Sequence, residues 1–225
     1  MRKKLMIFGI LLVVAIVAVW GGSAIYAKIG NEQAPDTLSL SSPTSGATPD
    51  GTIAAAELSG TWKISDGSQA GYRVKEVLNG QDVTVVGRTE GVSGQATIDG
   101  TSLTAATAVV DMGNVTTDNS SRDSQFQGIL KTSEFPTSTF TLTSPVDIGV
   151  IAGGATTTEA AGQLSIAGVT RDVKVALNVQ TTADGVEVQG TIPVTFSDYG
   201  IDAPNLGFVK VENAGAVEML LKFKK

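Results

Sequence analysis

The sequence predicts an all-β domain of antiparallel strands with one short helix, preceded by a separate apolar N-terminal segment. Two observations predict the strands. Apolar and polar residues alternate with a period of two over several stretches, as they do in strands with one buried face. Turn dipeptides separate these stretches, namely Asp66-Gly67, Asn79-Gly80, Asp99-Gly100 and Asp184-Gly185. A third observation, one polar run with helix-capping residues, predicts the helix.

Residues 1–30 form a unit of their own. Arg2, Lys3 and Lys4 precede an apolar run from Leu5 to Ala27 that contains no charged residue. As a helix rising about 1.5 Å per residue, this run reaches roughly 30 Å and is long enough to cross a bilayer. Because basic residues stay on the cytoplasmic side, we expect a single-pass membrane anchor with the C-terminal domain outside the cytoplasm. The alternative is a cleaved signal peptide, which would leave a secreted domain.

The next segment, residues 31–58, is rich in Ser, Thr, Pro and Ala, a composition that predicts a flexible linker. Residues 59–225 then form one globular domain. Four of the 16 basic residues and none of the 22 acidic ones lie in residues 1–30, so residues 31–225 carry a formal charge of −10. This charge argues against nucleic acid or an anionic lipid surface as a partner, because Lys and Arg supply most of the binding to both.

The composition also excludes most catalytic and metal sites. The chain has no cysteine and no histidine, so thiolate nucleophiles, disulfides, histidine bases and the commonest metal ligands are absent. No phosphate-binding glycine loop, dinucleotide fingerprint, Gly-x-Ser-x-Gly elbow or Ser-x-x-Lys pair occurs in the sequence. We therefore expect a protein that is not an enzyme and that needs no metal or cofactor.

Three long strands are predicted from alternation in the second half of the domain. Their apolar faces are Val173, Val175, Leu177 and Val179; Val186, Val188, Ile192, Val194 and Phe196; and Val217, Met219, Leu221 and Phe223. Shorter alternating pairs are Tyr72 with Val74, Phe140 with Leu142, and Leu164 with Ile166. Pro193 lies inside one predicted strand and indicates an edge or a bulge, because proline cannot donate to the strand ladder.

The helix is predicted over residues 118–127. Thr117 or Asp118 is the expected N-cap, and Phe126 and Leu130 should face inward. Arg122 and Asp123 on this helix suggest either a site for a lipid head group or a surface ion pair and capping network, and the second interpretation is favoured. The strands themselves leave two architectures open, a filled sandwich or a barrel around a cavity.

Several motifs spaced along residues 59–225 resemble the YceI-like family. In chain order they are Gly60-Thr-Trp62-Lys-Ile64; the polar run 113–123 ending in Arg122-Asp123; Glu134-Phe135-Pro136 with Phe140; Gly162-Gln-Leu164-Ser-Ile166-Ala-Gly168-Val169-Thr170-Arg171; and Asp198-Tyr-Gly200 with Gly207-Phe208-Val209. The resemblance implies an extended lipocalin-like antiparallel β-barrel that holds a long-chain isoprenoid lipid, with a polyprenyl or quinone-type tail. Many family members carry histidines in the first strands, and this chain has none, so a histidine-dependent role is not transferred.

The expected function is therefore extracytoplasmic binding of an apolar isoprenoid lipid, with the membrane as partner through residues 1–30. The candidate barrel-lining residues are Tyr72, Val74, Phe126, Leu130, Phe140, Leu142, Phe196, Phe208 and Met219. Each of them could equally be part of an ordinary filled core. The alternative function is accordingly a non-catalytic structural or interaction module with a filled β core. A homodimer formed through an edge strand is compatible with either function.

Overall fold

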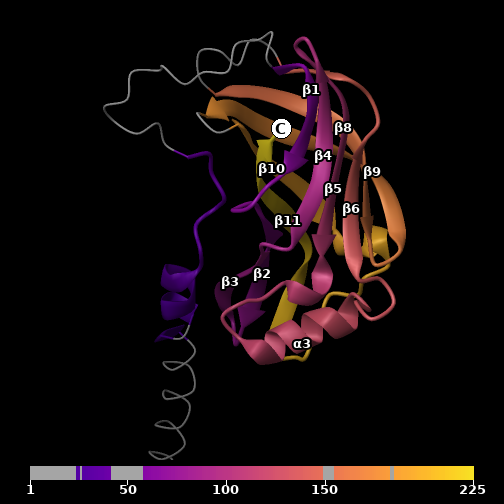
Figure 1. Cartoon of the computed structure of the whole chain (residues 1–225). Coiled ribbons are helices and arrows are strands. Elements are labelled where there is room, and N and C mark those ends of the chain that lie inside the picture. The colour runs from indigo at the N-terminus through magenta and orange to yellow at the C-terminus, as the bar shows by residue number, and fades with distance from the viewer. Residues whose placement is uncertain (1–23, 26, 42–57, 149–154, 183–184) are drawn as a thin grey trace, which may run out of the picture.

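The computed structural model describes residues 24–25, 27–41, 58–148, 155–182 and 185–225 (Figure 1). The strands are β1 (Gly60–Ile64), β2 (Gln69–Leu78), β3 (Gln81–Thr89), β4 (Val92–Asp99), β5 (Ser102–Asp111), β6 (Thr137–Leu142), β7 (Val146–Asp147), β8 (Thr156–Ile166), β9 (Val169–Thr182), β10 (Gly185–Thr195) and β11 (Val209–Lys224). The helix α3 (Ser120–Ile129) and two 3₁₀ turns, η1 (Met112–Asn114) and η3 (Phe196–Tyr199), lie between strands.

Eight antiparallel strands close into a barrel. Their order is β1-β4-β5-β6-β8-β9-β10-β11, and the last strand returns to the first through the pairs Lys63↔Lys224 and Ile64↔Phe223. A closed ring leaves no free strand edges within it. The predicted antiparallel β-barrel is confirmed, and the sandwich alternative is excluded.

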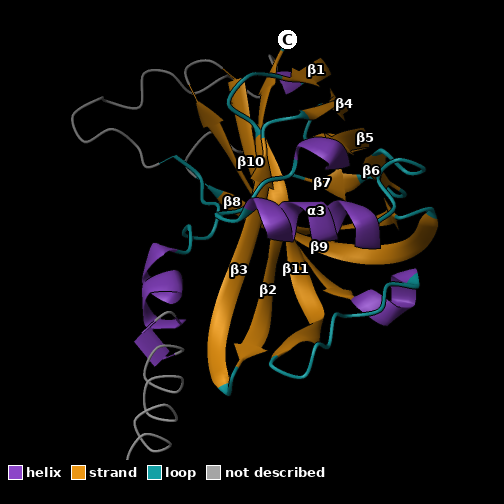
Figure 2. Ribbon diagram, turned by 90° about the horizontal axis from the view of Figure 1, so that it is seen from below, coloured by secondary structure: helices purple, strands orange, loops and turns teal. Residues whose placement is uncertain are grey.

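The hairpin of β2 and β3 extends the sheet beyond the barrel. β11 pairs with β1 only near its C-terminus, whereas the pairs from Val209↔Leu78 to Leu220↔Gln69 join it to β2. A register shift in β11 between Val211 and Gly215 marks a bulge, which bends the strand. Seen from below in Figure 2, α3 crosses the same end of the molecule as β2, β3 and the start of β11. This arrangement places a helix opposite a three-stranded extension of the sheet.

The predicted alternation gives the barrel its core. Val175, Leu177 and Val179 of β9 and Ile192 of β10 are all buried. The pairing of β10 with β9 ends at Thr191, and Pro193 pairs with Ala216 of β11 alone. Pro193 therefore lies at a local edge, as predicted, and the register of β10 with β11 runs through it without a bulge.

Helix α3 begins two residues later than predicted, because Asn119 is its N-cap. The Asn119 side-chain oxygen accepts hydrogen bonds from the backbone N–H groups of Ser121 and Arg122. The two expected caps have other partners. The Thr117 hydroxyl bonds to the Asp123 carboxylate, and the Asp118 carboxylate pairs with Arg122. The domain contains more helix than the single one predicted there, since η1 and η3 also occur. The described residues 24–25 and 27–33 are helical too, at the end of the predicted N-terminal helix and beyond it.

The N-terminal segment contacts the barrel. Asn31 donates from Nδ2 to the Asp82 carbonyl (2.8 Å) and accepts from the Thr84 N–H (2.7 Å), so it occupies part of the β3 edge. Residues 34–41, here called the strap, continue along the outside of the barrel. The Ser41 N–H and hydroxyl both donate to the Glu187 carboxylate. The predicted linker 31–58 is therefore held to the domain as far as residue 41, through side-chain hydrogen bonds that composition does not reveal.

The predicted membrane anchor falls mostly outside the described residues. Among the residues that are described, no helix combines the length and the apolar character needed to span a bilayer. Residues 42–57 of the predicted linker also lie outside them.

Candidate functional site

A cavity of about 420 Å³ lies between β2, β11 and α3 at the lower end of the barrel. This volume falls within the range of roughly 300–1,000 Å³ that is typical of small-molecule sites. Leu206 and Phe208 line it and are each 59% exposed, so the cavity reaches the surface at the turn that precedes β11. Most of its wall is apolar, contributed by the strands, by α3 and by residues 201–211.

Six of the nine predicted lining residues surround this cavity: Tyr72, Val74, Phe126, Leu130, Phe196 and Phe208. The other three, Phe140, Leu142 and Met219, line a second cavity of about 60 Å³ inside the closed part of the barrel. The wall of the smaller cavity is also apolar and includes Trp62 and Phe223. The sequence pattern did not distinguish the residues around the large cavity from those around the small one.

A layer of buried side chains lies between the two cavities. Along β10, Val188 lines the small cavity and Val194 the large one, while Ile192 between them is buried and lines neither. The same holds along β8, where Leu164 is buried between Ala160 and Ile166. The interior therefore consists of a larger and a smaller chamber in series.

Two stacked aromatic rings form one wall of the large cavity. The rings of Tyr72 and Phe126 are 4.9 Å apart and nearly parallel, at 10°. A Cβ at Gly87 on the neighbouring strand would come within 2.3 Å of the Tyr72 ring, so only glycine leaves space for it. Burial raises the pKa of Tyr72 to about 12, although Arg122 acts in the opposite direction. The phenol is therefore neutral at physiological pH and can donate a hydrogen bond.

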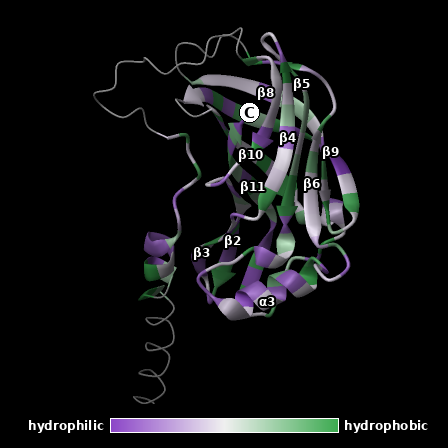
Figure 3. Cartoon of the chain, viewed as in Figure 1, coloured by the Kyte–Doolittle hydropathy of each residue, from purple (hydrophilic) through white to green (hydrophobic). Residues whose placement is uncertain are grey.

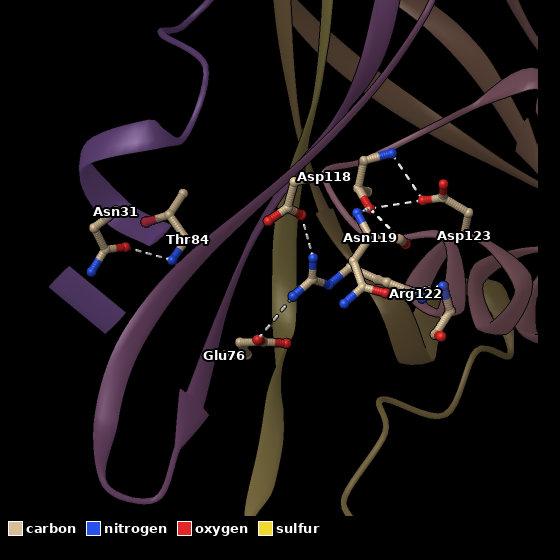
Figure 4. Close-up of polar contacts among 9 residues, drawn as sticks. Asn31, Glu76, Thr84, Asp118, Asn119, Arg122 and Asp123 are labelled. Atoms are coloured by element: carbon tan, nitrogen blue, oxygen red, sulfur yellow. Dashed lines mark hydrogen bonds and ion pairs between the residues drawn. The ribbon is translucent and has the colours of Figure 1, made fainter. Parts of the chain in front are cut away.

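Much of the polar part of the wall comes from α3, its cap and Glu76 of β2; Arg73, Ser138 and Tyr199 also line the cavity. Arg122 pairs through Nη1 with Asp118 Oδ1 at 2.6 Å and through Nη2 with Glu76 Oε1 at 3.5 Å (Figure 4). Asp123 accepts hydrogen bonds from the N–H and hydroxyl of Thr117, at 2.8 and 2.7 Å. Asp123 thus belongs to a capping network, whereas Arg122 belongs to an ion-pair network that is partly shielded from solvent rather than a surface pair. The ion-pair network stands at the cavity, because Arg122 and Glu76 line it, whereas Asp123 and Thr117 do not.

Among the lining residues that were not predicted, Glu76 could have been found from the sequence and Leu206 could not. Glu76 lies two positions beyond Val74 in β2, so a period of two places it on the inward face. Composition argues against such a position, because carboxylates usually lie at the surface. Leu206 precedes Gly207-Phe208 in a turn closed by a hydrogen bond from the Leu206 N–H to the Val209 carbonyl. No local pattern reports that such a turn reaches a cavity.

Tyr199 also lines the large cavity and is only 4% exposed. Its hydroxyl has no hydrogen-bond partner among the described residues. A buried hydroxyl without a partner costs roughly 1–3 kcal/mol.

The fold and the site together define an antiparallel barrel with an internal apolar cavity that opens at one end. The model of the YceI-like domain matches residues 62–223, and the chain belongs to this family. A comparison with curated protein sequences gives no significant match.

Two solved structures show the same fold. One is a polyisoprenoid-binding domain from Saccharophagus degradans that is implicated in plant cell wall breakdown; it is 21% identical, has a TM-score of 0.59, and the match covers 73% of this chain and 97% of that one. The other is Burkholderia cenocepacia BcnA, which is 18% identical with a TM-score of 0.53, over 67% of this chain and 94% of that one.

Proposed function

We propose that this protein binds a long-chain isoprenoid lipid, of polyprenyl or quinone type, and carries or shelters it outside the cytoplasm without chemical change. The observation that carries the proposal is the apolar cavity of about 420 Å³ that opens beside Phe208. Protein interiors are normally packed with few voids larger than a water molecule. A space of this size therefore favours a ligand over a filled core. Membership of the YceI-like family and the polyisoprenoid-binding domain from Saccharophagus degradans point to the same class of ligand.

Burial of the tail alone supplies enough affinity. Each buried CH₂ contributes about 0.8 kcal/mol, so ten carbons moved from water contribute roughly 8 kcal/mol before the entropy of association is subtracted. The wall contributes aliphatic and aromatic side chains for such contacts. Shape and length of the tail would then decide which lipid fits.

The proposed location is the outer face of a membrane. The apolar run from Leu5 to Ala27 would anchor the chain, or direct its secretion if it is cleaved. The helical residues between 24 and 33 lie beside the lower end of the barrel, the end at which the cavity opens (Figure 1). An anchor continuing from this helix would hold the cavity mouth close to the bilayer from which a lipid is taken.

The test is native mass spectrometry of the full chain in amphipol, with organic extraction of bound material. A discrete adduct of isoprenoid mass is expected, and Val217→Phe, which introduces a ring at the cavity wall, should lose it. Val109→Phe is the matched control, because Val109 lies on β5 but lines neither cavity. A clean apoprotein mass that persists after incubation with quinones and polyprenols would instead support the filled interaction module.

A further inference from the structure

The cavity wall has a polar region at α3 where the head group of a bound lipid can lie, and the following inference rests on the proposed lipid-binding function. Glu76 on β2 and four residues of α3 and its cap, Asn119, Ser121, Arg122 and Gln125, form this region. Hydrophilic residues are visible along α3 at the lower end of the barrel in Figure 3. Because an unpaired polar group is costly in an apolar wall, the head should lie here and the tail along the remaining wall.

The charges in this region are mostly negative. Arg122 is the cation that lines the cavity beside Tyr72, and it stands between the carboxylates of Asp118 and Glu76 (Figure 4). Glu76 is only 8% exposed, so its charge is poorly screened by solvent. Asp123 adds a third carboxylate near the Tyr72 phenol. An anionic head group would meet the Glu76 carboxylate in the cavity wall, and the arginine beside it already pairs with Glu76 and with Asp118, which lies outside the wall.

The N-terminus of α3 does not offset this repulsion. Helix N-termini commonly bind anions through free backbone N–H groups. Here the N–H groups of Ser121 and Arg122 donate to the Asn119 side chain, and that of Asp123 donates to the Asn119 carbonyl. The Asp123 carboxylate already provides a negative charge in the first turn.

We infer that the cavity selects an uncharged, hydrogen-bonding head group, such as a quinone ring or a free alcohol, and rejects the phosphate ester of the same tail. The amide of Gln125 and the hydroxyl of Ser121 line the cavity and supply neutral donors and acceptors for such a head. The rejecting elements are the carboxylates of Glu76 and Asp118, so they determine specificity without being needed for tail binding.

The experiment compares two ligands with one tail, geranylgeraniol and geranylgeranyl phosphate. The full chain in amphipol, stripped of lipid, is offered both at equal concentration, and bound ligand is quantified by mass spectrometry after extraction. The alcohol is expected to bind at least about tenfold more tightly, a difference of about 1.4 kcal/mol. Glu76→Gln should lower this preference severalfold by strengthening phosphate binding alone.

Asp118→Asn provides a second test in case the buried Glu76 substitution affects folding, because Asp118 has an exposed side chain. Glu159→Gln is the control, since it removes a carboxylate from an exposed pair with Lys174 that does not line either cavity. Equal or tighter binding of the phosphate by the wild type overturns the head-group inference and leaves the carrier function standing. An unchanged preference in both Glu76→Gln and Asp118→Asn also overturns it. Binding of neither ligand overturns the carrier function itself.

Discussion

Tyr72 gives the wall of the large cavity both an apolar ring and a polar hydroxyl group. Its ring is stacked on Phe126 and presents apolar surface, while its hydroxyl lies close enough to Arg122 and to three carboxylates to interact with their charges. Burial is the largest cause of its raised pKa. A phenol in this environment stays neutral and gives the wall a donor without adding charge.

The raised pKa predicts a late ionisation step. In an absorbance titration of phenolate formation, the wild type should show a step near pH 12 that Tyr72→Phe lacks and the control Tyr199→Phe keeps. The folded state holds the Tyr72 proton more tightly than the unfolded chain, whose tyrosine pKa is about 10. The associated stability is thus complete below about pH 10 and is lost as the pH rises toward 12. A Tyr72→Phe protein that loses stability as steeply as the wild type over this range would contradict the assignment.

At the residue scale the sequence predicted some of the inward residues but not their contacts. Alternation identified Tyr72 and Val74 from their spacing alone. The stacking of Tyr72 on Phe126 joins residues 54 positions apart on different elements. Such contacts depend on the tertiary arrangement of elements that are distant in the sequence, and a local sequence pattern carries no information about that arrangement.

The outer face of β2, β3 and β11 carries a buried ion cluster that alternation did not predict. Glu218 on β11 is only 3% exposed; it pairs with Arg73 Nε of β2 at 2.6 Å and with Arg88 Nη2 of β3. Arg73 also donates to the Pro35 carbonyl of the strap. The sequence pattern predicted one buried face and one solvated face, but the N-terminal segment contacts the second face here.

Glu218→Ala should strongly destabilise the protein, because it leaves two partly buried guanidinium groups without their shared carboxylate. Breaking a buried pair typically costs about 3–5 kcal/mol. Urea unfolding measures this loss, and Glu159→Ala, at an exposed pair with Lys174, should unfold close to the wild type. If the two variants unfold at similar urea concentrations, the cluster does not stabilise the sheet extension.

The strap should contribute stability through Glu187. Burial opposes ionisation of this carboxylate, but hydrogen bonds from Ser41 and Gln180 and the charge of Lys222 outweigh that effect and lower its pKa. Because the folded pKa is depressed, the stabilisation is present at neutral pH and is lost as the pH falls through the folded pKa. Ser41→Ala removes the hydroxyl donor and should lower the free energy of unfolding at pH 7 by roughly 1–2 kcal/mol.

The control for this prediction is Ser39→Ala, an exposed position on the same strap. Urea unfolding of both variants at neutral and at acidic pH is the measurement. A deficit of Ser41→Ala that is equally large at both pH values would argue against the role of the Glu187 charge.

Across the whole molecule, the layer formed by Ile192 and Leu164 divides the interior into two chambers. We predict that Ile192→Ala joins them and lets the protein accept longer isoprenoid tails relative to short ones. The substitution should also cost about 2–5 kcal/mol of stability, whereas Ile192→Val should cost about 0.5–1.5 kcal/mol. Competition between tails of different length, read by mass spectrometry, tests the change in preference. An unaltered preference in a folded Ile192→Ala protein would show that the layer does not limit the tail.

At the scale of the whole molecule, the sequence pattern did not predict whether the sheet closes into a barrel. Closure depends on pairing between β1 and the end of β11, two strands at opposite ends of the domain. Alternation is identical in a sandwich and in a barrel, so only the resemblance to a family predicted closure. The volume of the cavity could not be predicted from the sequence either, because it depends on the distance between the β2–β3 extension and α3.

The two pairings of β11 have a consequence for how such a protein can change. Its C-terminal end closes the ring against β1, while its earlier part builds the larger chamber with β2. Substitutions in the chamber wall therefore lie away from the closing pairs. In this architecture, substitution of a few cavity-lining residues can change the ligand specificity while the fold is retained.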